Sequence, residues 1–144
     1  MTRKEATLLM LSMSNGEPYT PVQIQKAMFL IAKNYPETID GIGYDFKPYA
    51  YGPFDKTVYD DIRILENEGF VQTSMNITRQ WNEYQITSKG LEKSEEIKNQ
   101  VDDKSIIQYF EEVSKFVRSL SFSKLVTSIY KVYPEMKINS IFRE

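Results

Sequence analysis

The first part of the chain places apolar residues at helical spacing between clear start and stop signals. Thr2, followed three residues later by Glu5, has the sequence of a capping box and predicts a helix over residues 3–13. Thr20 precedes a proline and a second run of helically spaced apolar residues, so it predicts the start of another helix, which Pro36 ends. Two helices are therefore expected before residue 40.

Residues 41–53 break this pattern, because they are rich in glycine, proline and tyrosine and predict a short strand or an extended loop. The Gly-Pro pair that ends the segment predicts a turn that starts a third helix. Val58, Ile62 and Leu65 repeat at helical spacing in that helix. Gly69 is expected to end it with a left-handed cap.

In the middle of the chain the apolar period changes from helical spacing to a period of two. Residues 70–74 and 81–86 predict two antiparallel strands joined by a polar loop. Thr87 offers a hydroxyl that can cap a further helix directly after the second strand. Helical spacing then returns and predicts two more helices, over residues 103–119 and 123–133.

This order of elements predicts a mainly α protein with a small antiparallel β-hairpin. Three helices, a hairpin and a further helix are the element order of a winged helix, so we expect a winged-helix-like domain with a C-terminal helical extension. Residues 1–101 would form the winged-helix-like core. Residues 102–144 would form a C-terminal helical pair packed on the same domain, since the length fits one domain.

The end of the predicted hairpin has a sequence with a clear structural logic. Residues 83–90, Glu-Tyr-Gln-Ile-Thr-Ser-Lys-Gly, resemble the Tyr-x-Leu-Thr-x-x-Gly junction that closes the hairpin in many bacterial winged-helix proteins. Tyr84 and Ile86 are expected to face the core. Thr87 should cap the next helix, and Gly90 should allow that helix to approach the hairpin closely.

Further stretches carry a narrower resemblance. They are Gln-Lys-Ala-Met-Phe-Leu at 25–30 and Tyr-Ala-Tyr-Gly-Pro-Phe at 49–54, and with them the chain resembles the Panacea or SocA-like family of small phage-associated and antitoxin proteins. Residues 125–135 resemble the C-terminal helix of uncharacterised bacterial and archaeal relatives, whereas residues 34–44 depart from the family. The resemblance implies a fold related to the winged helix and a setting in prophage, toxin–antitoxin or defence loci. It also implies binding to another protein, such as a toxin or a phage or host factor, and it supplies no catalytic residues.

The composition removes most enzyme chemistry. The 144 residues include neither cysteine nor histidine, which excludes disulfides, the common zinc ligand sets and Ser-His-Asp or Cys-His arrangements. Adjacent carboxylates at 60–61 and 95–96 point about 100° apart on a helix, so they do not converge on one substrate atom. We therefore predict a cytoplasmic protein that is not an enzyme, with no cofactor, no metal, no catalytic residues and no membrane partner.

Aromatic side chains are the leading candidates for a partner-binding surface, because tyrosine and tryptophan supply rigid contact area with a polar end. The predicted partner-binding residues are Tyr49, Tyr51, Tyr59, Trp81, Tyr109 and Phe116. The alternative for the first three is core packing around the Gly-Pro turn. The alternative for Trp81 is a cross-strand anchor within the hairpin.

The predicted helix over residues 103–119 is apolar over more than one face. Its stripe consists of Ile106, Phe110, Val113, Val117 and Leu120, and Ile107, Tyr109 and Phe116 add apolar surface at flanking positions. A homodimer or a partner protein is expected to cover the surplus, unless the body of the domain does so.

Duplex DNA is the alternative partner. Its candidate contacts are Lys26, Lys56, Arg63 and Arg79, with Lys33 and Lys47, if these side chains converge on one face. Against DNA stand the five acids predicted beside two bases on the third helix, which are Asp55, Asp60, Asp61, Glu66 and Glu68. The function predicted first is therefore a non-enzymatic protein-binding regulatory module of the antitoxin or phage-associated type. A winged-helix DNA-binding transcriptional regulator is the alternative, and a dimerising structural subunit is the third possibility.

Overall fold

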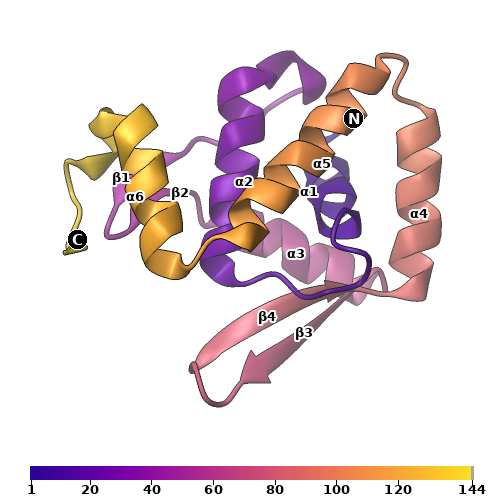
Figure 1. Ribbon diagram of the computed structural model, residues 1–144. Helices are drawn as coiled ribbons and strands as arrows, with labels where there is room; N and C mark the ends of the chain where they lie inside the picture. Colours follow the sequence, from indigo (N-terminus) through magenta and orange to yellow (C-terminus); the bar gives the residue numbers. More distant parts are fainter. Residues whose placement is uncertain (144) are drawn as a thin grey trace.

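Six α-helices make up most of the structure, a computed structural model that describes residues 1–143 (Figure 1). The described residues also form two small antiparallel hairpins. The expectation of a mainly α protein with a β-hairpin is therefore confirmed. In chain order the elements are α1 (Arg3–Ser12), α2 (Pro21–Asn34), η1 (Pro36–Thr38), β1 (Lys47–Tyr49), β2 (Gly52–Phe54), α3 (Thr57–Asn67), β3 (Val71–Asn76), β4 (Trp81–Ile86), α4 (Ser88–Asn99), α5 (Lys104–Ser119), α6 (Phe122–Val132) and η2 (Pro134–Lys137).

Side-chain hydroxyls cap the N-termini of several of these helices, because they accept hydrogen bonds from backbone N–H groups that have no partner within the first turn. Thr2 and Thr20 form capping boxes with Glu5 and Gln23, respectively. The Thr87 hydroxyl accepts a hydrogen bond from the first turn of α4. The predicted starts of α1, α2 and α4 are therefore confirmed.

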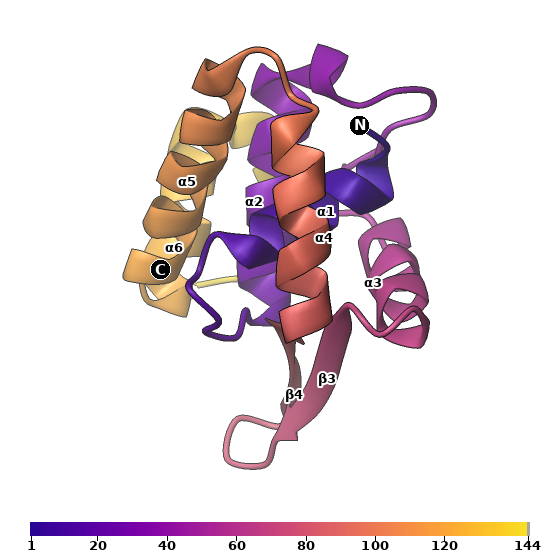
Figure 2. The same cartoon turned by 90° about the vertical axis from the view of Figure 1, so that its right-hand side faces the viewer.

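Helices α1 and α2 pass through the middle of the core. Residues 6–11 of α1 are all buried, because α1 contacts α2, α3, α4 and α5 on its different sides. Figure 2 shows α4 in front of α1, with α3 on one side and the α5–α6 pair on the other. Helix α2 also contacts α6, so the C-terminal helices pack on the same core as the first half of the chain.

The hairpin β3–β4 projects from one end of the molecule (Figure 1). Its register runs from Val71 opposite Ile86 to Asn76 opposite Trp81, which confirms the predicted antiparallel pair. The first strand begins one residue later and ends two residues later than predicted. At the base, Tyr19 adds a single bridge to the hairpin, because its N–H and C=O each bond to Tyr84 at 2.8 and 2.9 Å.

The junction after β4 has the expected geometry. Tyr84 and Ile86 are buried, and α4 crosses the start of the hairpin at Gly90. A Cβ added to Gly90 would lie 2.2 Å from the carbonyl oxygen of Phe70, which no side chain can occupy. Glycine at this position is therefore required by the close approach of α4 to the hairpin.

The hairpin β1–β2 corrects one expectation. The turn predicted at Gly52 and Pro53 is wrong, because these residues lie within β2 and the chain reverses at Ala50 and Tyr51. Helix α3 begins instead at Thr57, whose N–H donates a hydrogen bond to the carboxylate of Asp55 at 2.9 Å. Residues 41–53 thus supply a second hairpin in place of one strand or loop.

The C-terminal segment holds this short hairpin in place. The N–H of Ile141 donates to the carbonyl of Ala50 at 3.0 Å, and the Asn139 amide donates to the carbonyl of Pro48 at 3.2 Å. Strands of three residues are marginal on their own. The hairpin β1–β2 is therefore stabilised by contacts with residues about 90 positions away in the sequence.

Helix α5 is rotated relative to the predicted stripe. Ile107 is buried, whereas Ile106 and Leu120 are only partly buried, so the expected stripe is wrong at its two ends. The buried face of α5 also includes the polar Ser114, whose hydroxyl forms a hydrogen bond with that of Tyr19. None of the helices in residues 1–143 is both long and apolar enough to cross a membrane.

Candidate functional site

Four of the six predicted partner-binding residues line one apolar groove of about 340 Å³. The groove lies where the β1–β2 hairpin, the start of α2, α3, β4 and the start of α6 meet. We call it the aromatic groove after its six aromatic wall residues, which are Tyr49, Tyr51, Phe54, Tyr59, Trp81 and Phe122. Elements from both halves of the chain are therefore needed to form it.

Ring contacts fix the rim of the aromatic groove. Tyr49 stacks on Phe54 with ring centroids 5.2 Å apart, and Tyr51 meets Phe122 edge-on at the same separation. The two rim tyrosines are nevertheless 60% and 43% exposed, so much of their ring surface faces solvent. Core packing therefore covers only part of these two rings.

Tyr59 on α3 forms the inner part of the wall. Its ring contacts Phe54 at 5.8 Å and Tyr84 at 5.9 Å between centroids. Burial raises the pKa of its hydroxyl above the usual value, so the side chain stays neutral across the physiological range. Tyr59 therefore contributes no tyrosinate charge to the wall.

Lys26 lies in the floor of the aromatic groove and is only 3% exposed. Its ammonium donates to the carbonyl of Pro53 at 3.2 Å. No carboxylate of residues 1–143 forms an ion pair with it, and burial lowers the pKa of the ammonium to about 7. The floor is therefore a buried amine that changes charge near neutral pH.

Gly52 lies close to this amine. Its φ of +102° lies in the region that favours glycine, and a Cβ there would come within 3.4 Å of the Lys26 Cε and 3.5 Å of its Nζ. Any larger residue would place its Cβ in contact with Lys26 and with the ring of Tyr130, 3.4 Å away. The Gly-Pro sequence of β2 thus serves the floor of the groove, not a turn.

The burial of Lys26 corrects the set of cations proposed for DNA. The expectation that Lys26 shares an exposed face with the other candidates is wrong, because the β1–β2 hairpin covers it. Lys56 and Arg63 remain exposed on α3, but both face the carboxylate of Asp60, at 3.9 and 3.5 Å. Arg79, in the loop of the second hairpin, lies 6.0 Å from the ring centre of Trp81.

The acidic face predicted for α3 also needs correction. Asp61 is buried, because its carboxylate accepts hydrogen bonds from Arg3 at 2.9 Å and from the Tyr44 hydroxyl at 2.7 Å. Asp55 is engaged at the helix start, where it also accepts from the N–H of Asp45. Three of the five acids are left beside two bases, so the repulsion of phosphate is weaker than the sequence indicates.

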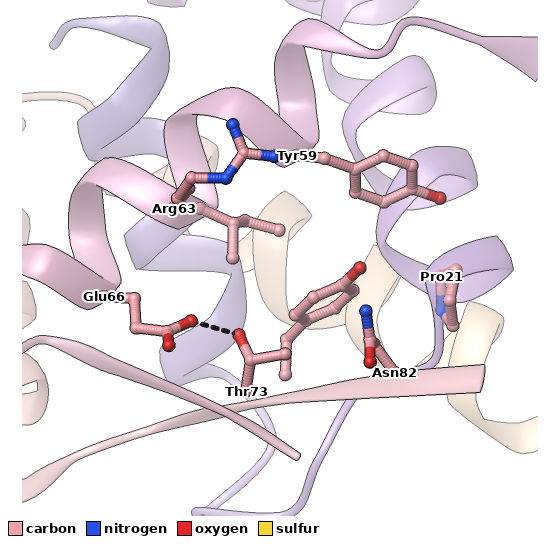
Figure 3. A pocket seen from close by; sticks show the side chains of 8 residues that line it. Pro21, Tyr59, Arg63, Glu66, Thr73 and Asn82 are labelled. Carbon is pink, nitrogen blue, oxygen red and sulfur yellow. Dashed lines mark hydrogen bonds between the residues drawn. The ribbon is translucent and has the colours of Figure 1, made fainter. Parts of the chain in front are cut away.

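A second, more polar hollow of about 370 Å³ adjoins the aromatic groove and shares Tyr59 with it. Figure 3 shows this hollow between α3 and the β3–β4 hairpin, with the carboxylate of Glu66 bonded to the hydroxyl of Thr73. Tyr59 and Arg63 reach into it from the helix, and Asn82 faces them from the strand. Polar contacts are therefore available beside the apolar groove.

The remaining two predicted residues lie elsewhere, on α5. The Tyr109 hydroxyl accepts from the Asn34 amide at 2.8 Å, its ring contacts Tyr35, and burial raises the pKa of the hydroxyl. Phe116 is 40% exposed. Neither lines the aromatic groove, so the structure does not join the α5 surface to it.

Sequence reasoning missed Lys26 as a floor residue and Phe54 and Phe122 as wall residues. Phe54 ends the Tyr-Ala-Tyr-Gly-Pro-Phe stretch, so its place among tyrosines was a usable signal. Lys26 gave a weaker signal, as a lone cation in an otherwise apolar run of α2.

No family model matches the chain, and no curated protein matches it in sequence. In residues 1–143, no group of three or more acidic side chains is placed to hold a metal ion.

Proposed function

We propose that the protein is a non-enzymatic, protein-binding regulatory module of the antitoxin or phage-associated type, built on a winged-helix-like fold and acting in the cytoplasm. The order of three helices, the β3–β4 hairpin and α4 supports this fold, as does the bridge that Tyr19 adds to the hairpin. The partner would be another protein, such as a toxin or a phage or host factor.

The observation that carries the proposal is the aromatic groove. Tyrosine and tryptophan are enriched at protein interfaces, where a few such residues supply most of the binding energy. Tyr49 and Tyr51 are exposed yet already ordered by contacts with Phe54 and Phe122, so binding would cost little side-chain entropy. A protein segment placed there would bury ring surface that now faces water.

Duplex DNA remains the second candidate, because one observation favours it. The burial of Asp61 removes one acid from the outer face of α3, which is the helix that a winged-helix regulator would place in the major groove. Lys56 and Arg63 still share Asp60 as a neighbour. We therefore expect only weak, non-specific DNA binding, no tighter than about 10⁻⁴ to 10⁻⁶ M.

The test is co-purification of the tagged protein from its host, in three forms compared by quantitative mass spectrometry. Tyr49→Ala removes the most exposed ring of the groove, and Phe116→Ala removes a ring on α5 that is 40% exposed. We expect a partner that wild type and Phe116→Ala retain and that Tyr49→Ala loses by about tenfold. Retention by Tyr49→Ala with loss by Phe116→Ala would move the interface to α5 and contradict the proposal.

A further inference from the structure

The aromatic groove contains one charged side chain among its lining residues, and that charge has no counter-ion. Lys26 carries three N–H donors when protonated, and the Pro53 carbonyl accepts one of them. No other acceptor for this ammonium is present in residues 1–143. A buried ammonium without a partner charge is costly, so a ligand that supplies a negative charge would gain more here than at the surface.

A second donor, on a residue that lines the groove, also lacks an acceptor. The indole Nε1 of Trp81 is buried and has no hydrogen-bond partner in the described part of the chain. Indole can only donate, so the group that would satisfy it carries an acceptor oxygen or nitrogen. Lys26 and Trp81 thus both favour a ligand with anionic or carbonyl oxygens, set within apolar walls.

The size and lining of the groove narrow the class of ligand. A cavity of about 340 Å³ accommodates one large residue with its main chain, and its walls are mostly apolar. An extended internal segment would bring several backbone N–H and C=O groups against these rings, and few wall atoms could bond to them. A chain end brings fewer such groups, and it carries an apolar side chain and a carboxylate on the same Cα.

We infer that the aromatic groove receives the C-terminal residue of a partner protein, with the terminal carboxylate paired to the Lys26 ammonium and an apolar side chain among the aromatic walls. This inference rests on the proposed protein-binding function and adds the chemistry that the partner must present. The carboxylate would approach the Lys26 Nζ from the groove beside Gly52, where a Cβ would already lie 3.5 Å from the Nζ. A partner ending in an aromatic or aliphatic residue fits these features best.

The experiment uses two random octapeptide libraries that differ only in the chemical group at the C-terminus. One ends in a free carboxylate and the other in a carboxamide, and both are selected on the immobilised full-length protein. Selected peptides are then resynthesised in both forms and their Kd values are measured by fluorescence anisotropy. We expect enrichment only from the carboxylate library, of peptides that end in an aromatic or aliphatic residue, and about tenfold weaker binding after amidation.

Two variants connect this difference to the lysine. Lys26→Met removes the charge and keeps an unbranched stem, whereas Lys33→Met makes the same change at an exposed position of α2. We expect Lys26→Met to bind acid and amide peptides equally, and Lys33→Met to keep the tenfold preference. Amidation changes only the peptide, so the comparison within wild type holds even if Lys26→Met does not fold.

The contrary outcomes are distinct. Equal enrichment of amidated peptides with internal aspartate or glutamate would overturn the terminal carboxylate and assign the ion pair to a side chain. Absence of enrichment from both libraries would overturn the inference, while the proposed function would stand if Tyr49→Ala still loses a co-purified partner. If that loss is missing as well, both ideas fail.

Discussion

The aromatic groove and the outer face of α3 lie on either side of Tyr59. They differ in whether their cations are exposed to solvent and paired with an acid. On α3, Lys56 and Arg63 are exposed and close to Asp60, so their charges are solvated and partly balanced within the protein. In the groove, Lys26 is buried under the β1–β2 hairpin and no acid balances it. The two regions are neighbours in space, but only the groove offers a partner a cation that no acid of the protein balances.

Surface ion pairs such as those on α3 contribute about 0–1 kcal/mol, because water competes for both charges. Replacing these ion pairs by contacts with a partner is therefore expected to change the free energy of binding only slightly. A buried cation without a counter-ion has already lost its water, so a partner's anion meets less competition there. The groove is thus expected to supply more of the binding energy than the face of α3.

The largest expected effect is a pH dependence of stability due to Lys26. Its pKa is about 7 when folded and near its ordinary value of 10.5 when unfolded, so between these values only the unfolded chain binds the extra proton. The free energy of unfolding should therefore increase with pH, by about 2 kcal/mol between pH 7 and 9. Urea unfolding at pH 7, 8 and 9 measures it.

Two variants isolate this contribution. Lys26→Met should remove the increase, and Arg63→Met, which changes the balanced cation on α3, should keep it. The range stops at pH 9 because burial raises the pKa of Tyr19 to about 12, so unfolded tyrosines ionise before folded ones above pH 10. A stability that stays level or falls between pH 7 and 9 in the wild-type protein would show that Lys26 remains charged when folded.

A smaller effect is expected from two glycines with left-handed backbone, one in each region. Gly52, in the floor of the groove, has a φ of +102°, and Gly69, after the end of α3, has a φ of +85°. Alanine at either position should lower the free energy of unfolding by about 1–2 kcal/mol, because of backbone strain. Only Gly52→Ala should also weaken binding of carboxylate peptides, since its methyl group would lie beside the Lys26 Nζ. Urea unfolding and peptide anisotropy separate the two effects.

The smallest effect concerns DNA. Arg63→Ala and Lys56→Ala should each change the affinity for duplex DNA by less than about threefold, because Asp60 already faces both cations. A gel-shift titration at physiological salt checks this, with wild type as reference. Nanomolar, salt-dependent binding that either variant abolishes would make α3 the functional surface instead of the groove.

Most of the helices and the β3–β4 hairpin could be predicted because their signals are local. Thr20 caps α2 within four residues, and the alternation from Trp81 to Ile86 is contained in one strand. The β1–β2 hairpin was missed for the opposite reason. Its strands have three residues each, and part of what holds it is the hydrogen bond from Ile141 to Ala50.

In the candidate site, too, the residue types could be predicted from local sequence, whereas their arrangement depends on distant residues. The tyrosines could be proposed from their residue type, whereas their convergence depends on how the hairpin folds over α2. Lys26 and Asp61 were both placed at the surface, since charged residues are seldom buried. Their actual positions depend on the hairpin in one case, and on Arg3 and Tyr44 in the other, which are distant in sequence. No periodicity in α2 or α3 could have indicated those contacts.

The central claim, that a protein partner occupies the aromatic groove and not the face of α3, can be tested with two single-site labels. Trp81 is the only tryptophan and the chain has no cysteine, so 5-fluorotryptophan marks the groove alone, and Arg63→Cys coupled to a trifluoromethyl reagent marks α3 alone. ¹⁹F NMR is then recorded while the unlabelled co-purified partner is added. We predict that the Trp81 resonance shifts and saturates while the label at position 63 is unchanged. A shift at position 63 with an unchanged Trp81 resonance would contradict the account.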